Sequence, residues 1–332
     1  MSDITKGFRR TGHYALVAVD ALDIKILRDL IQSRATSPLD PDFRKSFSTI
    51  ARNLGVDADT IRSRVRRLHQ DGLVKDWHII INPHLFGGDD YAVWFDVQSA
   101  AKEGLIEELK LLEGVFEITS FLGSGFIIFF HSENPHYLDR QLELMRRVSK
   151  VQFLDFAKIA FPECNLRLSK TDWAVLRALH RSPRKTHAAI SKEAGLSTRT
   201  VKRRLERMVL GGVAFAFPVI DPKALQGAVM AALLVSYPSD RKAEVDIQIA
   251  SFLSGLLFHI LHLEPRHSGD QFSVFSLMLT NVSEAKEVLE QVKQVSYIRS
   301  ARIDLHEDMI IIFDSLDESL ASRLEKMLGA DG

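Results

Sequence analysis

Apolar and polar positions along the chain alternate with either helical or strand-like periodicity. The order of these helical and strand-like segments occurs twice. In residues 22–30, LDIKILRDL, the apolar positions fall on one face of a predicted helix. A shorter amphipathic stretch, 47–55, follows, and Gly55 can end it because glycine tolerates positive φ. Residues 60–73, TIRSRVRRLHQDGL, predict a third helix with a basic face.

The second half of the chain carries the same series. Shifting the sequence so that Thr60 falls on Thr200 also places Gly72 on Gly212, a position where each third helix can stop. The corresponding basic helix reads TVKRRLERMVLGGV. A β-rich stretch typical of a wing follows each basic helix, at 74–83 and at 213–222.

The remaining segments alternate in the order β-α-β-β-α-β, once in 91–161 and again in 228–313, with a last helix at 317–329. This order is the ferredoxin-like arrangement. We therefore expect an α+β fold in which two winged helix-turn-helix domains alternate with two ferredoxin-like regulatory domains. The expected boundaries are an N-terminal segment 1–20, winged helix-turn-helix 21–87, ferredoxin-like 88–164, winged helix-turn-helix 165–227, ferredoxin-like 228–316 and C-terminal helix 317–332.

Composition narrows the class of protein. The 43 basic and 43 acidic residues give zero net charge, which argues against a wholly basic coat for nucleic acid but permits a local basic patch. The single cysteine, Cys164, excludes an internal disulfide and a multi-cysteine zinc site. Without a long apolar run or a secretion signal, the chain is expected in the cytoplasm, with no membrane partner.

Each third helix is predicted to turn apolar residues inward and basic residues outward. A short helix and a tight turn precede it, which is the layout of a recognition helix. The arginine fork suits phosphate oxygens and guanine edges, whereas a lone basic helix is more often a plain solvated surface. The repeated context favours DNA. The predicted DNA-binding residues, hydroxyls for phosphate included, are Thr60, Arg62, Ser63, Arg66, Arg67, Thr198, Arg199, Thr200, Lys202, Arg203 and Arg207.

The two predicted recognition helices differ in charge. Where the second has Arg199, the first has Asp59, and an outward carboxylate repels phosphate unless it accepts from cytosine. We expect both helices to bind DNA, the second more strongly. The predicted operator is therefore asymmetric.

Taken together, IARNLGVDADTIRSRVRRLHQDGLV (50–74) and ISKEAGLSTRTVKRRLERMVLGGV (190–213) resemble the Lrp/AsnC family of transcriptional regulators. Members usually carry one winged helix-turn-helix and one ferredoxin-like domain and pair as dimers, so this chain resembles two fused protomers. The resemblance implies a sequence-specific regulator of double-stranded DNA, not an enzyme. It also implies two half-sites about one helical turn apart and further pairing as a homodimer.

The resemblance also implies a small-molecule effector such as an amino acid. Family members often have Gly followed shortly by Asp before the third strand of the regulatory domain, near the effector. The first half offers Gly123 and Gly125 without an Asp, and the second offers Gly269 and Asp270. Ordinary hairpin turns are the alternative explanation for these glycines.

No catalytic residue, cofactor or metal is expected. His259 and His262 lie three apart on a predicted strand and should project to opposite faces, and no HExxH, Walker or GxSxG motif occurs. Two other classes stay open. Sirohaem decarboxylases resemble this architecture and would grip tetrapyrrole carboxylates with histidines and arginines, with His78 as the candidate. A sensor or interaction module that never touches DNA is the third class.

Overall fold

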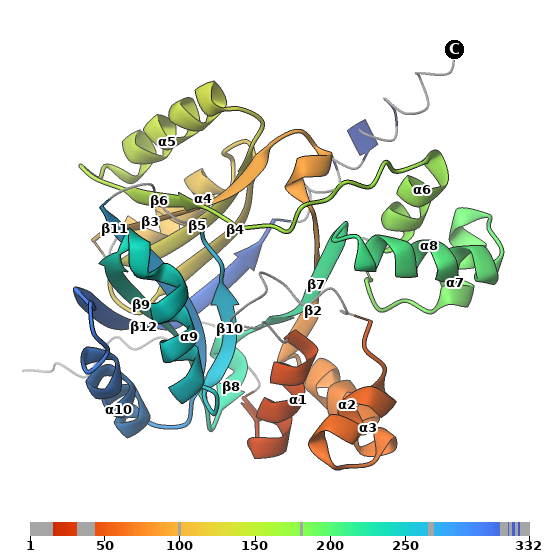
Figure 1. The fold of residues 1–332 in the computed structure, drawn as a ribbon, viewed down its shortest axis with the longest axis horizontal. Coiled ribbons are helices and arrows are strands. Elements are labelled where there is room, and N and C mark those ends of the chain that lie inside the picture. Colours follow the sequence, from red (N-terminus) through yellow and green to blue (C-terminus); the bar gives the residue numbers. More distant parts are fainter. Residues whose placement is uncertain are drawn as a thin grey trace, which may run out of the picture.

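The computed structural model describes residues 16–31, 44–98, 101–179, 182–264 and 269–312, with 318, 321, 322 and 325 beyond them. Helices and strands mix as the predicted α+β class requires (Figure 1). The predicted helix 317–329 and most of the loop 35–45 lie outside these continuous ranges. Within them, no helix is long and apolar enough to cross a membrane.

The first helical unit consists of α1 (Ala21–Ile31), α2 (Phe47–Leu54) and α3 (Ala58–Gln70), followed by strand β2 (Val74–Ile81). Helix α2 begins where the Ser46 side chain accepts a hydrogen bond from the Thr49 amide. It ends at Gly55, whose φ of 68° confirms the predicted left-handed cap. Ile50 and Ile61 lie fully buried between the helices.

The second helical unit follows the same local rules. It consists of α6 (Lys170–Leu179), α7 (His187–Ala194) and α8 (Thr198–Leu210), followed by β7 (Ala214–Ile220). Thr186 caps α7 and Ser197 caps α8 with side-chain oxygens, and Gly195 ends α7 at φ 65°. The two units therefore present their third helices after similar turns.

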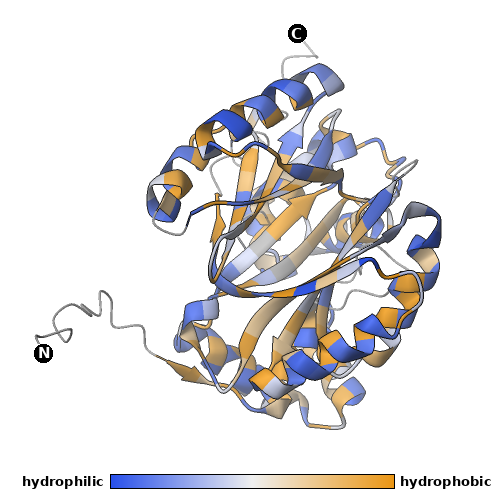
Figure 2. Cartoon of the chain, turned by 90° about the vertical axis from the view of Figure 1, so that its left-hand side faces the viewer, coloured by the Kyte–Doolittle hydropathy of each residue, from blue (hydrophilic) through white to orange (hydrophobic). Residues whose placement is uncertain are grey.

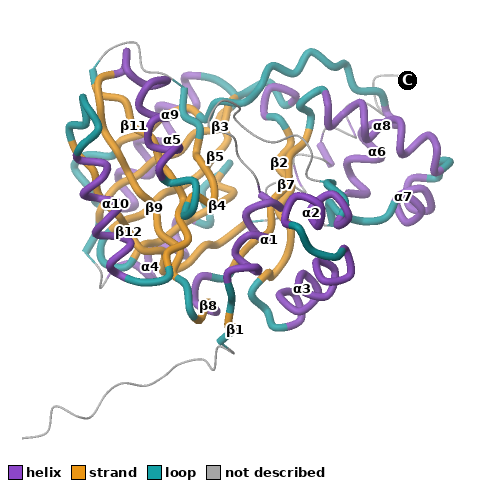
Figure 3. Tube along the Cα trace, turned by 60° about the horizontal axis from the view of Figure 1, so that its bottom comes forward, coloured by secondary structure: helices purple, strands orange, loops and turns teal. Residues whose placement is uncertain are grey.

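Strands β2 and β7 pair with each other to form an antiparallel ribbon between the helical units (Figures 1 and 3). Ile79 and Ile81 of β2 belong to the core of the second helical unit, which is the unit from the other half of the chain. Ile220 of β7 packs with Leu27 and Leu68 of the first unit. Each helical unit is thus completed by a strand from the opposite half.

The other large strands form one eight-stranded sheet of order β10-β11-β9-β12-β4-β5-β3-β6. Strand β12 joins the halves, because its first part pairs with β9 and its second part with β4. A bridge between Ile159 and Leu263 brings the two edges of this sheet together, so we call it the curled sheet. Its strands are β3 (Asp89–Asp96), β4 (Val115–Phe121), β5 (Gly125–Ser132), β6 (Asp155–Lys158), β9 (Val229–Pro238), β10 (Leu257–Leu261), β11 (Asp270–Leu279) and β12 (Ser300–Ile311).

Helices cover the outside of the curled sheet (Figure 2). They are α4 (Lys102–Leu109), α5 (Pro135–Ser149), α9 (Lys242–Phe252) and α10 (Val282–Lys293). Since side chains alternate along a strand, Val93 and Phe95 pack under the outer helices while Ala92 and Trp94 face the interior. There they meet residues of the other half, among them Leu234. The shorter elements in the described part of the chain are β1 (Val17–Ala18), β8 (Leu225–Gln226) and 3-10 turns at Pro83–Leu85, Pro222–Ala224 and Ser239–Arg241.

Ionisable groups also face this interior. Glu117 of β4 is buried, and its carboxylate accepts a hydrogen bond from the Thr119 hydroxyl at 3.3 Å. Burial raises the pKa of Glu117 to about 7. Burial also lowers the pKa of His306 on β12, to about 4. At pH 7 the His306 imidazole is therefore neutral, while the Glu117 carboxyl is divided about equally between its two forms.

The raised pKa of Glu117 makes stability depend on pH. In the unfolded chain the carboxyl ionises near 4.5, so stability falls as pH rises from there to the folded value of about 7. Glu117→Gln should therefore stabilise the protein by about 3 kcal/mol above pH 7 and change little near pH 4. Urea unfolding at both pH values measures this, with the exposed Glu103→Gln as control. An equal effect at both pH values would contradict it.

Candidate nucleic-acid interface

Helices α3 and α8 are held by their apolar faces. Ile61, Val65 and Leu68 of α3 are buried, as the helical wheel predicts. Val201, Leu205 and Met208 hold α8 in the same way. The opposite faces of both helices are therefore turned toward solvent.

Five of the predicted basic residues stand exposed on these outer faces: Arg62, Arg66, Arg199, Lys202 and Arg203. Arg62 forms an ion pair with Asp59 one turn earlier, and Lys202 lies 3.8 Å from Glu206. Exposed pairs of this kind contribute little to stability, so phosphate can replace the carboxylate.

Arg207 has an internal partner. Its guanidinium donates to Asp172 of α6 at 2.8 Å, and Arg204 donates to the other oxygen of the same carboxylate at 2.8 Å. The Asp172 side chain is completely buried and also accepts from the Ser169 amide and hydroxyl. Burial alone would raise the pKa of Asp172, but the hydrogen bonds from Ser169 and Arg204 outweigh it and lower the pKa.

The first helical unit has the same arrangement. Arg64 and Arg67 of α3 both donate to Asp23 of α1, which is also completely buried. We call the two groups, Asp23 with Arg64 and Arg67 and Asp172 with Arg204 and Arg207, the carboxylate clamps. Arg67 and Arg207 still expose 40% and 47% of their side chains, so DNA contact by both stays a prediction.

The predicted hydroxyl contacts are less uniform. Ser63 and Thr198 are exposed, and Thr60 is half-buried. The Thr200 hydroxyl lies 2.9 Å from the Ser197 hydroxyl, inside the cap that starts α8. Thr200 therefore has a structural task in addition to its predicted contact with phosphate.

The two helical units are tied together by a reciprocal contact. Arg44, just before α2, donates to the carbonyl oxygens of Pro183 at 2.6 Å and Lys185 at 2.8 Å, which precede α7. Arg184 returns the contact by donating to the Lys45 carbonyl oxygen at 2.8 Å. Its guanidinium also lies over the Phe47 and Trp77 rings, at 5.1 and 5.2 Å. This arginine interlock, together with the β2–β7 ribbon, fixes the relative position of α3 and α8.

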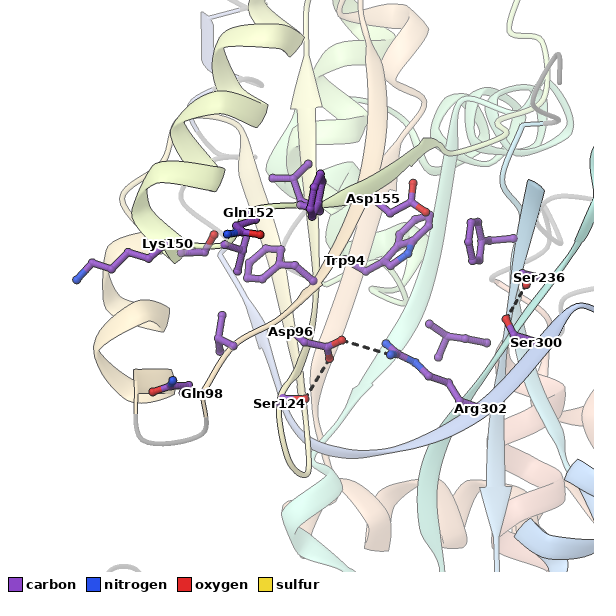
Figure 4. Close-up of a pocket in the computed structure, with 18 of the residues that line it drawn as sticks. Trp94, Asp96, Gln98, Ser124, Lys150, Gln152, Asp155, Ser236, Ser300 and Arg302 are labelled. Carbon is purple, nitrogen blue, oxygen red and sulfur yellow. Dashed lines mark hydrogen bonds and ion pairs between the residues drawn. The ribbon is translucent and has the colours of Figure 1, made fainter. Parts of the chain in front are cut away.

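The predicted effector residues lie near one end of the curled sheet. Gly123 adopts φ 96° in the β4–β5 turn, and Ser124, between Gly123 and Gly125, lines an open cleft of about 1280 Å³. Figure 4 shows Asp96 of this cleft bonded to Ser124 and paired with Arg302 of the other half. Gly269 forms a turn with φ 81°, and Asp270 pairs with Arg299. Neither Gly269 nor Asp270 lines the open cleft.

A smaller cavity lies at the opposite end of the curled sheet, against the β2–β7 ribbon. His259 and His262 both line it, together with the residues between them, and that the two imidazoles project to opposite faces stays a prediction. Strand β10 ends at Leu261, so His262 lies just beyond the strand. Among the described residues, no cluster of His, Cys, Asp or Glu is arranged to hold a metal ion. The side chain of His78 lies outside the described residues.

A solvent-facing basic helix on a three-helix unit with a following wing defines a winged helix-turn-helix protein. Residues 168–213, which cover α6 to α8, match the family model for winged helix-turn-helix DNA-binding domains.

Within this class the chain is similar, over about a third of its length, to transcriptional regulators that include AsnC. It is 32% identical over 106 residues to the HTH-type transcriptional regulator Ptr1 of Methanocaldococcus jannaschii, covering 32% of this chain and 66% of that protein. It is also 32% identical over 101 residues to the regulatory protein AsnC of Haemophilus influenzae, covering 30% of this chain and 61% of that protein. The matched regions span less than two thirds of the length of these relatives.

A similar fold over nearly the whole chain occurs in a solved structure. The siroheme decarboxylase NirDL superposes with a TM-score of 0.54, covering 93% of this chain and 99% of that one at 15% identity. At this identity the likeness concerns the fold alone.

The carboxylate clamps predict a specific loss of stability. Asp172→Ala should destabilise the second helical unit by about 2 kcal/mol, because Arg204 and Arg207 lose their shared buried acceptor. Glu143→Ala, which removes an exposed partner of Arg146 and Arg147, is the matched control and should change stability by less than about 0.5 kcal/mol. Thermal unfolding of both variants measures the difference. Equal losses would show that the clamp contributes no more than a surface pair.

Proposed function

We propose that the protein is a sequence-specific DNA-binding transcriptional regulator that reads two half-sites with helices α3 and α8. The observation that carries this proposal is that each of these helices uses one set of residues for packing and exposes another. An apolar face and a carboxylate clamp hold the helix in place, while a second set of basic residues has, among the described residues, no ionic partner other than an exposed acid. Such a surface suits phosphates and base edges.

The spacing of the half-sites follows from the arginine interlock. Arg44 and Arg184 join the two helical units through backbone carbonyl oxygens, so the distance between the recognition helices is set within one chain. In ordinary dimers that distance corresponds to about one turn of DNA. Because Asp59 stands in the first helix where Arg199 stands in the second, the two half-sites should differ in sequence.

We propose that the halves are tandem copies that together correspond to one dimer. The curled sheet supports this reading, because β12 and β4 join the halves and the bridge at Ile159 and Leu263 joins the edges. Further homodimerisation stays a prediction, and it would have to use a surface other than these sheet edges.

The open cleft is the better candidate site for an amino-acid effector, because its lining offers more suitable groups than the predicted loop residues do. Its lining includes Lys150 and Arg302 as well as Asp96 and Asp155, so both ends of a zwitterion have a possible counter-charge. The aromatic side chains of Trp94 and Phe272 also line this cleft.

The decarboxylase alternative is supported by fold likeness and by the histidines of the smaller cavity. Against it, the described residues that line that cavity include neither Lys nor Arg, which a polycarboxylate tetrapyrrole would require. In the open cleft the two cations are matched by two carboxylates. The charge pattern therefore favours the regulator.

Removing the free basic residues of α8 should weaken DNA binding. The triple variant Arg199→Ala, Lys202→Ala, Arg203→Ala should bind its genomic sites at least tenfold more weakly, with a salt slope smaller by about three. The control triple, Arg146→Ala, Arg147→Ala, Lys286→Ala, removes equal charge from outer helices α5 and α10. Filter binding across a salt series compares them. Equal losses in both triples would indicate charge attraction without a defined reading helix.

Changing the distance between half-sites tests the interlock. Inserting about five base pairs, half a helical turn, should reduce wild-type affinity at least tenfold because one recognition helix then faces the wrong side of DNA. Arg184→Ala should tolerate the insertion better, whereas Arg177→Ala, an exposed α6 residue, should behave as wild type. Gel-shift titrations on both operators measure this. Wild-type indifference to the insertion would show that only one helix reads DNA.

A further inference from the structure

The cavity at the ribbon end of the curled sheet has a volume of about 140 Å³. Its walls come from both halves of the chain, through interior side chains of β4, β5, β9, β10, β11 and β12. Ile80, Pro218 and Ile220 of the ribbon line it on one side, and Phe161 of the connecting segment contributes another aromatic ring. A cavity of about 150 Å³ holds a benzene-sized molecule. The space therefore suits one aromatic ring or a fused pair of rings.

A carboxyl group with one hydrogen-bond partner and an imidazole with none among the described residues face this space. The only hydrogen bond to the Glu117 carboxylate from the described residues is the one from Thr119. Both ring nitrogens of His306 are buried without a hydrogen-bond partner there. The His306 ring lies edge-on to the ring of Phe121, with centroids 5.0 Å apart. Unpaired buried groups of this kind cost about 1–3 kcal/mol each, and a bound molecule would recover that cost.

The charge of the lining restricts what can bind. The described residues that line the cavity include no Lys and no Arg, so a carboxylate or a phosphate would meet no cation among them. A neutral imidazole provides one N–H donor and one acceptor, and a carboxyl group can donate or accept according to its protonation. The aromatic walls, Phe116, Phe129 and Phe258 among them, favour a flat ring.

We propose that this cavity binds an uncharged heteroaromatic molecule of one or two rings, which exchanges hydrogen bonds with Glu117 and His306 through a ring N–H and a ring nitrogen. The occupant differs in charge from the amino acid proposed for the open cleft, and it occupies the opposite end of the curled sheet. If the proposed function holds, it would act as an effector, because Ile80 and Ile220 belong to the ribbon that carries both helical units.

Calorimetric titration of the full chain tests the proposal without DNA, so its failure is distinct from failure of the regulator. Benzimidazole, which has both ring groups, should bind one molecule per chain. Indene, which has the same shape without nitrogen, and benzoate, which is an anion, should each bind at least tenfold more weakly. Benzoate binding as tight as benzimidazole binding, or no binding of benzimidazole, overturns the proposal.

Variants locate the bound molecule. Ser276→Leu, which fills the cavity from β11, and His306→Phe, which removes the imidazole, should each weaken benzimidazole binding at least tenfold. Ser236→Ala, on the wall of the open cleft, should leave it unchanged. Thermal unfolding and circular dichroism establish that each variant is folded, and Glu117→Gln provides a near-isosteric second test of the polar contact. Unchanged binding in folded Ser276→Leu would show that benzimidazole binds elsewhere and overturn the proposal. Displacement of benzimidazole by an iron porphyrin would overturn it in favour of a tetrapyrrole site.

Discussion

The pairing of β2 with β7 is the constraint on which the remaining structure depends. A two-stranded ribbon is marginally stable alone, so this one requires packing on both of its faces. Its side chains enter the cores of both helical units, and Ile80, Pro218 and Ile220 also border the cavity of the curled sheet. Any shift in the register of this ribbon would therefore move the recognition helices and the cavity wall together.

The carboxylate clamps divide the basic residues of each third helix into an inner set and a solvent-facing set. Within α8, Arg204 and Arg207 meet Asp172 on the inner side, while Arg199, Lys202 and Arg203 face solvent. The same separation of roles occurs in α3 around Asp23. Counting arginines along a helix therefore overestimates the charge available to DNA, because part of it is already neutralised inside the domain.

Much of the fold follows from local patterns in the sequence. The helical faces of α3 and α8 and the caps at Gly55 and Gly195 arise from interactions within a few residues, whereas β2 and β7 pair with each other across the two halves of the chain. The closing strand of the first half is shorter than its apolar pattern predicts, Asp155–Lys158 in place of 151–161, because only these residues find a ladder partner on β3.

The contacts that the sequence pattern did not predict all join residues that are distant in the chain. The acceptor of Arg67 is Asp23, far earlier in the chain, although an Asp at the matching place in both halves was a usable signal. The contact of Arg184 with Lys45 had no such signal, since it depends on how the two units meet. The cavity that His259 and His262 line likewise draws its walls from both halves of the chain.

The joining of both halves in one chain has a consequence for symmetry. Two identical subunits must repeat every residue, so a pocket on their axis is lined by matched pairs of the same side chain. Here the third residue of β4 is Glu117 and the third residue of β10 is His259, and both line the cavity. A carboxyl and an imidazole thus occupy places that a symmetric dimer would fill alike. The cavity has a direction, and an asymmetric molecule can enter it in one preferred orientation.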